Sequence, residues 1–151
     1  MKNLNITLNF DLDGTIADLY GVDNWLEMLI AEDETPYAIA KPLVRLNILA
    51  RRLNTLQRNG YKLAIITWLA KNATAEYDEK VIAAKLMWLK KHLPSVIFEE
   101  IAIIAHGTPK STAIPKAKYG VLFDDEEYNR TEWNGLACEP QDMFKCLRCL
   151  F

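Results

Sequence analysis

The chain has 151 residues, the length of one ordinary domain, and its 50% apolar and 25% charged residues are typical of a folded globular protein. Its formal net charge of -2 excludes a globally basic nucleic-acid-binding protein, although it says nothing against a local basic patch. No apolar run reaches the roughly 18 residues of a spanning helix, and the sequence does not begin like a signal peptide. We therefore expect one domain over residues 1–151, located in the cytoplasm and without a membrane partner.

The first predicted element is a strand over residues 4–10, where apolar and polar residues alternate before the acidic turn DLDGT at 11–15. The segment at about 21–59 is predicted to be helical, with Pro36 and Pro42 separating two helices. Apolar residues at helical spacing form one face of the first helix: Trp25, Leu26, Leu29 and Ile30. Leucines form the corresponding face of the second helix: Leu43, Leu46, Leu49, Leu53 and Leu56.

Strands and helices continue to alternate in the remaining sequence. An almost continuous apolar run at 61–67 predicts a strand that is covered on both faces. A helix at about 77–92 follows, and its predicted apolar face consists of Val81, Ile82, Leu86 and Leu89. The later predicted elements are a strand at 99–105, a short helix opening near Lys110, a strand at 119–125, a helix at about 126–134 and a strand at 136–138. This alternation predicts an α/β fold with a mostly parallel sheet and helices on both faces.

Three cysteines lie near the end of the sequence: Cys138, Cys146 and Cys149. An odd number cannot pair completely within one chain, so no disulfide framework is expected. Cys146 and Cys149 form a CxxC pair, but there is no second CxxC and no histidine at zinc-finger spacing. We therefore expect free thiols and a terminal amphipathic helix in which Phe144 and Leu147 pack inward.

Polar residues follow several of the predicted strands, at the edge where α/β sheets bind their ligands. They are Asp11 and Asp13 after the first strand, Thr67 at the end of the second, and Asp124 and Asp125 after the last long strand, with Lys110 before it. A group of carboxylates repels itself unless a cation or a proton neutralises it, and Mg²⁺ prefers such oxygen ligands. The sequence therefore predicts a magnesium site at this edge of the sheet.

This arrangement predicts phosphoryl transfer. Asp11 is the expected nucleophile, which forms an aspartyl-phosphate. Lys110 and the metal would neutralise charge on the phosphoryl group, and the Thr67 hydroxyl would bind one of its oxygens. Asp13 is placed to protonate the leaving oxygen and then to activate water. Thr15 is expected to hold the acidic loop in shape.

Each candidate also has a structural interpretation. The four aspartates are residue types that form turns or cap helices, and Thr67 could simply end its strand. Lys110 could be a solvated lysine, with Lys116 as a less well placed alternative. Three aromatic residues near the predicted site, Tyr20, Trp25 and Trp68, would either stack on a base or pack inside the protein. His106 is interpreted as a surface residue.

The motifs DLDGT, Thr67 at a strand end, Lys110 opening a helix and the acidic pair at 124–125 resemble, in order, the four motifs of the haloacid-dehalogenase superfamily of phosphohydrolases. The resemblance covers residues 6 to about 130 and implies a Rossmann-like three-layer α/β/α sandwich. It also implies magnesium bound by the Asp11 carboxylate, the Asp13 backbone carbonyl and Asp125, with Asp124 in support. Family dehalogenases usually lack the second aspartate of the first motif, so Asp13 points to phosphoryl chemistry.

The departures from the family pattern concern the substrate. Larger members insert a cap domain, whereas this sequence has only a small helical cap-like segment at about 18–43. Members with so small a cap often act on large substrates or borrow a lid, so a homo-oligomer or a partner that completes the lid is expected. The acidic pair followed by a helix is similar to deoxyribonucleotidases and polynucleotide phosphatases, which implies a nucleotide or a nucleic-acid end as the phosphorylated substrate.

The expected function is therefore that of a magnesium-dependent phosphatase of the phosphoric monoester hydrolase class. Two alternatives stay open. A phosphotransferase would need water to be excluded, which a small cap makes difficult. A catalytically weak magnesium-binding or regulatory domain would have no need for Asp13 beside Asp11.

Overall fold

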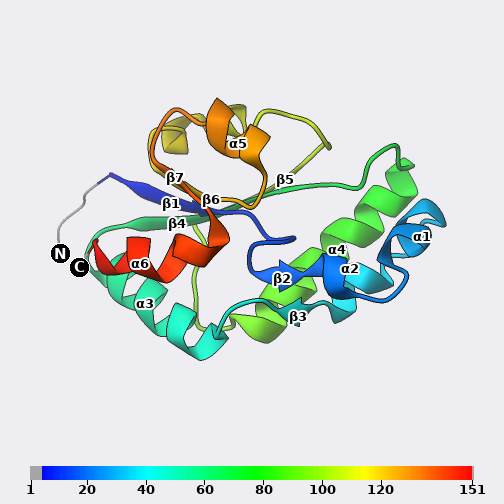
Figure 1. Cartoon of the computed structure of the whole chain (residues 1–151), viewed down its shortest axis with the longest axis horizontal. Helices are drawn as coiled ribbons and strands as arrows, with labels where there is room; N and C mark the ends of the chain where they lie inside the picture. The colour runs from blue at the N-terminus through cyan, green and yellow to red at the C-terminus, as the bar shows by residue number, and fades with distance from the viewer. Residues whose placement is uncertain (1–4, 151) are drawn as a thin grey trace.

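The computed structural model describes residues 5–150 of the chain. Its centre is a five-stranded sheet of order β5-β4-β1-β6-β7, in which all four pairings are parallel (Figure 1). The strands are β1 (Thr7–Phe10), β4 (Lys62–Trp68), β5 (Glu100–Ile104), β6 (Val121–Phe123) and β7 (Ala137–Cys138). The α/β Rossmann-like fold predicted from the alternating elements is therefore confirmed.

Helices cover both faces of this sheet, α5 (Glu127–Glu132) on one side and α3 (Leu46–Arg58) and α6 (Met143–Arg148) on the other (Figure 1). Successive strand residues point to opposite faces, so each strand contributes to two cores. In β4, Leu63 and Ile65 join the core that includes α3, α6 and α4 (Ala75–His92). Ala64 and Ile66 face the other core, which includes the short 3-10 helix η3 (Pro115–Ala117). Two further 3-10 helices are η2 (Lys110–Thr112) and η4 (Pro140–Asp142).

Residues 17–42 form a separate small unit between β1 and α3, which we call the β2–β3 segment. It consists of β2 (Ala17–Asp18), the 3-10 helix η1 (Leu19–Gly21), α1 (Trp25–Ile30), α2 (Thr35–Ile39) and β3 (Lys41–Pro42). Strands β2 and β3 pair antiparallel and close the unit at its base. The segment predicted to be helical at about 18–43 thus also contains a two-stranded sheet.

The prediction of two helices separated by Pro36 and Pro42 was wrong in its boundaries. Pro36 lies in the first turn of α2, where the N–H that proline lacks would have no helical partner. Pro42 lies in β3, and Leu43 is 45% exposed outside α3 instead of on its apolar face. The leucines predicted for that face that are fully buried are Leu49, Leu53 and Leu56.

Side-chain hydrogen bonds near both ends of α4 attach the β2–β3 segment to this helix. The Glu32 carboxylate accepts from the backbone N–H and the hydroxyl of Thr74, at 2.9 and 2.8 Å, where Thr74 caps α4. The Tyr77 hydroxyl donates to the Asp33 carbonyl at 2.9 Å, and Trp88 Nε1 donates to the Ala40 carbonyl at 2.8 Å. These contacts fix the segment against α4, and α2 lies beside this helix in Figure 1.

The buried face of α4 differs from the predicted one. Ile82 and Leu86 were expected to pack inward, but Leu86 is 42% exposed. The buried residues are Tyr77, Val81, Ala84, Lys85, Trp88 and Leu89. The face is rotated because the helix packs both on the sheet core, through Trp88 and Leu89, and on α2, through Tyr77 and Val81.

At the end of the described chain, α6 packs on the core through Met143 and Leu147, both fully buried, and through the half-buried Phe144. Cys138 is buried, Cys146 is half-buried and Cys149 is exposed. Within residues 5–150, no helix combines the length and the apolar character needed to cross a membrane.

Candidate active site

The acidic turn after β1 is held by backbone hydrogen bonds on both sides. Asp11 N–H donates to the Phe123 carbonyl at 2.9 Å, which carries the β1–β6 pairing one residue beyond the strands. The Leu12 carbonyl then accepts from the N–H groups of three residues that follow it. Gly14 has φ +79, and a Cβ there would collide with the Asp125 carboxylate. A glycine is therefore required for this turn to curl close to the end of β6.

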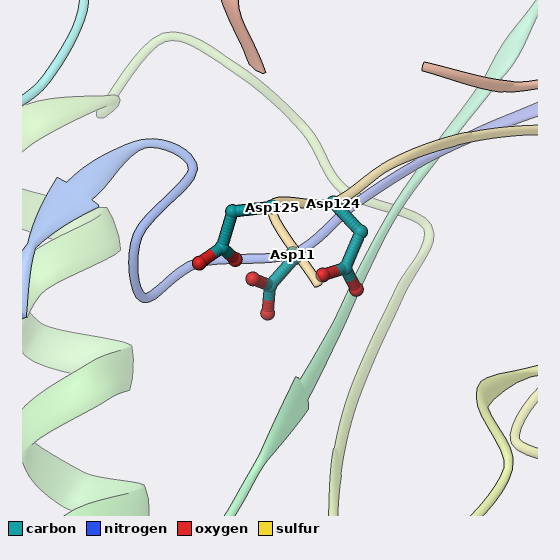
Figure 2. Close-up of side chains that lie close together, drawn as sticks. All are labelled: Asp11, Asp124 and Asp125. Carbon is teal, nitrogen blue, oxygen red and sulfur yellow. The ribbon is translucent and has the colours of Figure 1, made fainter. Parts of the chain in front are cut away.

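Three carboxylates meet where β1 and β6 end. Oxygens of Asp11, Asp124 and Asp125 all lie within 4.8 Å of one another, and Asp11 and Asp124 are buried (Figure 2). The Thr15 hydroxyl lies 3.1 Å from Asp11 Oδ2 and 3.4 Å from Asp125 Oδ1. Thr15 therefore lies in the turn and also connects Asp11 to Asp125.

Lys110 neutralises one side of this cluster. Its buried Nζ lies 2.8 Å from Asp11 Oδ1 and 2.6 Å from Asp124 Oδ2. Burial alone would lower the pKa of Lys110, but the two carboxylates outweigh it and raise the pKa above its ordinary value. Asp124 also accepts from Asn129 Nδ2 at 3.2 Å and from the Glu126 N–H at 2.9 Å. The oxygens of Asp124 are therefore already occupied by protein donors.

Asp125 is in a different situation. Among the described residues, no lysine, arginine or histidine forms an ion pair with it. The pKa of Asp125 is raised to about 8. Burial is the largest cause, and the hydrogen bond and charge repulsion with Asp11 add to it. Burial and the charge of Asp11 also raise the pKa of Asp124, to about 6. The cluster lacks positive charge on the side of Asp125, and a bound cation would supply it.

A second buried lysine, Lys85 of α4, contacts both Asp13 and Thr67, the two remaining residues predicted for the site. Its Nζ lies 2.8 Å from Asp13 Oδ2 and 2.7 Å from Thr67 Oγ1, and it donates to the Trp68 carbonyl at 2.6 Å. It also lies 5.0 Å from the centre of the Tyr37 ring. Because the Thr67 hydroxyl accepts from Lys85, its own proton is free to be donated to a ligand. Burial raises the pKa of Asp13 above its ordinary value, and Lys85 opposes this shift.

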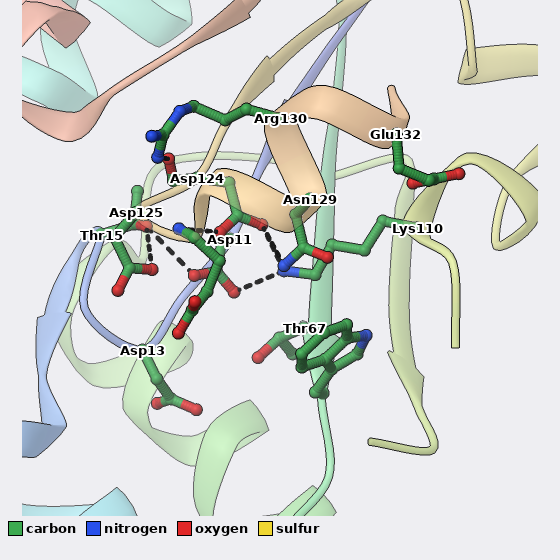
Figure 3. A network of polar contacts seen from close by, with 12 residues as sticks. Asp11, Asp13, Thr15, Thr67, Lys110, Asp124, Asp125, Asn129, Arg130 and Glu132 are labelled. Carbon is green, nitrogen blue, oxygen red and sulfur yellow. Dashed lines mark hydrogen bonds and ion pairs between the residues drawn. The ribbon is translucent and has the colours of Figure 1, made fainter. Parts of the chain in front are cut away.

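Lys85 is not among the residues predicted for the site, although its position in the sequence carries a signal. Lys85 lies four residues after Val81 and eight after Tyr77, on the stripe of α4 that faces inward. A lysine on an otherwise apolar helix face is expected to have a buried anionic partner. Figure 3 shows that all six residues predicted for the site, Asp11, Asp13, Thr67, Lys110, Asp124 and Asp125, lie together at one end of the sheet.

A cleft of about 560 Å³ opens above these residues, between the sheet and the β2–β3 segment. Asp11, Asp13, Asp125 and Lys110 line it on the sheet side. The facing side is formed largely by apolar residues of η1 and α1: Leu19, Tyr20, Trp25, Leu26, Leu29 and Ile30.

The aromatic residues considered from sequence all line this cleft, and they also contact other rings. Tyr20 meets Trp25 edge to face at 4.9 Å between ring centres, and Trp68 lies 4.7 Å from His106. His106, which was interpreted as a surface residue, is exposed but lines the cleft as well. The aromatic residues therefore both pack against other rings and line the cleft.

Comparison with known proteins extends the description of the fold. No protein-family profile matches the chain, and no curated protein matches its sequence. Among solved structures, a chain from the structure of the Pnkp1/Rnl/Hen1 complex is similar, with a TM-score of 0.55 and 16% sequence identity. The similarity covers 88% of this chain and 44% of that one, so this chain spans less than half the length of its neighbour. At so low an identity the likeness shows a shared fold.

Proposed function

We propose that this chain is a magnesium-dependent phosphatase that hydrolyses phosphate monoesters through an aspartyl-phosphate on Asp11. The observation that carries the proposal is the placement of the Asp11 carboxylate on the sheet side of the cleft, next to Asp125 and between Lys110 and Thr15. Lys110 and Thr15 hold one oxygen each, which orients the carboxylate toward the open space. A nucleophile needs this kind of orientation before it can attack a phosphorus atom.

The chemistry of the donors fits magnesium. The candidate ligand atoms are all oxygens, which suits a hard divalent cation that keeps part of its water shell. Asp11 and Asp125 would hold the ion together with the Asp13 backbone carbonyl. Asp124 would support them, because Lys110 and two N–H donors already bind its oxygens. When bound, the ion supplies positive charge that stabilises the phosphoryl group during transfer.

The remaining residues have distinct roles in this proposal. An Asp11 oxygen forms a bond to phosphorus while the bond from phosphorus to the leaving oxygen breaks, and Asp13 gives its proton to that oxygen. The raised pKa of Asp13, caused first by burial, favours the protonated form that an acid catalyst needs. Asp13 then takes a proton from water, whose oxygen attacks phosphorus and releases Asp11. Thr67 donates to a phosphoryl oxygen, and Lys85 keeps Thr67 and Asp13 in place.

The β2–β3 segment is proposed to act as a minimal cap over this site. It covers the cleft with the apolar side of η1 and α1, and its hydrogen bonds to α4 hold it there. A nucleotide or a nucleic-acid end is the proposed substrate class, because aromatic rings line the cleft beside the acidic residues.

The test is a screen of phosphate release with and without magnesium. The panel contains nucleotides, oligonucleotides phosphorylated at either end, sugar phosphates and phosphopeptides. Asp11→Asn should abolish release, whereas the exposed Asp142→Asn, on η4, should not. Magnesium binding without release of phosphate from any compound would refute the enzyme and favour a regulatory metal-binding domain.

A further inference from the structure

The side of the cleft formed by the β2–β3 segment exposes apolar surface. Ile30 is 75% exposed, Leu26 is 53% exposed and Tyr20 is 46% exposed, and all three line the cleft. Apolar surface gathered at one polar site is typical of a ligand-binding cleft, and a volume of about 560 Å³ is in the range found for small-molecule sites. A ligand that fits this cleft therefore has an apolar part next to its phosphate.

The sheet side of the cleft offers a fixed aromatic surface. Trp68 Nε1 donates to the Thr108 carbonyl at 2.9 Å, and the ring of His106 lies against the indole. The same indole lies 5.6 Å from Lys110 Nζ, which holds Asp11. Whatever is attached to a phosphate at Asp11 is thus placed within reach of the Trp68 ring, and a flat ring there is bound by stacking.

The charges around the cleft disfavour a nucleic-acid strand. Besides the acidic cluster, the described residues lining the cleft include the acidic Glu32 and Glu126, while Lys71 and Lys110 are its lysines. Lys110 is buried and already paired with two carboxylates. Binding a strand requires lysines or arginines that neutralise several backbone phosphates, and one exposed lysine does not provide them.

We infer that the cleft selects a small phosphate monoester whose leaving group carries a flat aromatic ring and is about the size of a nucleoside, in preference to a sugar phosphate or a polynucleotide end. The inference rests on the proposed function for the placement of the phosphate at Asp11. The inference goes beyond the proposed function because it chooses the nucleotide over the nucleic-acid end. The choice is based on the apolar residues that line the cleft and on the acidic Glu32 and Glu126 beside them.

Binding and turnover are measured separately. Isothermal titration calorimetry of the Asp11→Asn protein with magnesium compares three ligands: a nucleoside 5'-monophosphate, ribose 5-phosphate, and a short 5'-phosphorylated oligonucleotide whose first nucleotide has the same base. The corresponding 3'-phosphorylated ligands are compared in the same way. We expect the mononucleotide to bind about tenfold more tightly than the sugar phosphate, as one stacked ring provides. The oligonucleotide is expected to bind more weakly than the mononucleotide.

Matched variants locate the preference in the cleft. Ile30→Ser removes an exposed aliphatic side chain from the cleft, and Met87→Ser removes one that is 72% exposed on α4 and does not line it. Trp25→Leu is paired in the same way with Tyr119→Leu, whose ring is 72% exposed away from the cleft. The cleft variants should weaken mononucleotide binding by about three- to tenfold and leave ribose 5-phosphate binding unchanged. The two control variants should change neither.

The outcomes separate this inference from the proposed function. Equal binding of mononucleotide and sugar phosphate, tighter binding of the oligonucleotide, or equal effects of cleft and control variants would each overturn the inference. If the wild-type protein releases phosphate without the expected preference, the phosphatase proposal stands and the inference fails. If the preference is measured but no phosphate is released, the inference about the cleft stands and the proposed reaction fails.

Discussion

Replacing Lys85 by methionine tests whether this buried lysine holds the candidate acid–base residue in place. Methionine keeps most of the length and apolar character of the lysine side chain, so the change removes the charge with little loss of packing. The side chain of Lys85 is 1% exposed and that of its partner Asp13 is 14% exposed. The substitution therefore leaves a carboxylate, the Thr67 hydroxyl and the Trp68 carbonyl without their shared donor.

Removing one partner of a buried ion pair costs roughly 3–5 kcal/mol. Asp13 keeps limited contact with water, so we expect a loss near the lower end, about 3 kcal/mol of unfolding free energy. For a chain of this size that corresponds to a fall in Tm of roughly 6–12 °C. A domain stabilised by roughly 5–15 kcal/mol should still fold after such a loss. Activity should fall as well, because Asp13 and Thr67 lose the group that orients them.

The assay is urea denaturation followed by circular dichroism, together with a double-mutant cycle. Asp13→Asn in the Lys85→Met background removes the unpaired carboxyl group and should recover about 1–2 kcal/mol. Lys90→Met is the matched control, since Lys90 lies on the same helix and is exposed. Its effect should stay within about 0.5 kcal/mol. If Lys85→Met and Lys90→Met are equally stable, or if the cycle shows no coupling, the reasoning about the buried pair is refuted.

Three further predictions concern the acidic cluster. Because burial and Asp11 raise the folded-state pKa of Asp125 from 3.8 to about 8, the folded protein binds more protons than the unfolded chain between these values. The stability of the metal-free protein should therefore fall as the pH rises through this window, and magnesium should reverse the fall. Thermal melts with EDTA and with magnesium measure both effects. An Asp125→Asn variant with the same pH dependence as wild type would contradict the assignment of this effect to Asp125. Lys110→Met leaves Asp11 and Asp124 facing each other without their shared cation, so it should lower kcat by about 10²–10³-fold, and steady-state phosphate release that stays within threefold of wild type would exclude the proposed role. Gly14→Ala should lower the unfolding free energy, measured by urea denaturation, by about 1–3 kcal/mol, since alanine is strained at φ +79 and its Cβ meets the Asp125 carboxylate. The substitution should also weaken magnesium binding, measured by calorimetry. An unchanged magnesium affinity would show that the turn adjusts without moving the carboxylates.

The fold followed from sequence because alternating strands and helices allow few arrangements. Apolar runs such as 61–67 are too short for a buried helix and sit between helical patterns, which leaves a parallel sheet covered on both faces as the simplest solution. Parallel strands place their carboxyl ends at one edge, so the grouping of Asp11, Thr67 and Asp124 was predictable without knowing any distance. The roles of these residues in a reaction stay a proposal.

Helix faces were predicted less well, for a physical reason. Periodicity shows that α1 has an apolar side and that α4 has one, but it does not show what covers either side. In α4 the β2–β3 segment packs beside the sheet and shifts the buried face, so that Leu86 is exposed and Lys85 is enclosed. In α1 the apolar side remains partly open and lines a cleft.

The sequence by itself determined the order of the polar residues that follow the strands, the acidic turn at 11–15 and the supply of oxygen ligands, because these depend on local geometry and on residue type. Only the tertiary structure decided which carboxylate is paired and which lacks a cation. Asp124 lies against Lys110 and Asn129, whereas its neighbour Asp125 forms no ion pair with a lysine, arginine or histidine among the described residues. The two residues are chemically identical and adjacent in the chain. Their difference arises from the groups that the fold places beside each one: Lys110 and Asn129 reach Asp124 from two other parts of the chain, and neither forms a contact of this kind with Asp125.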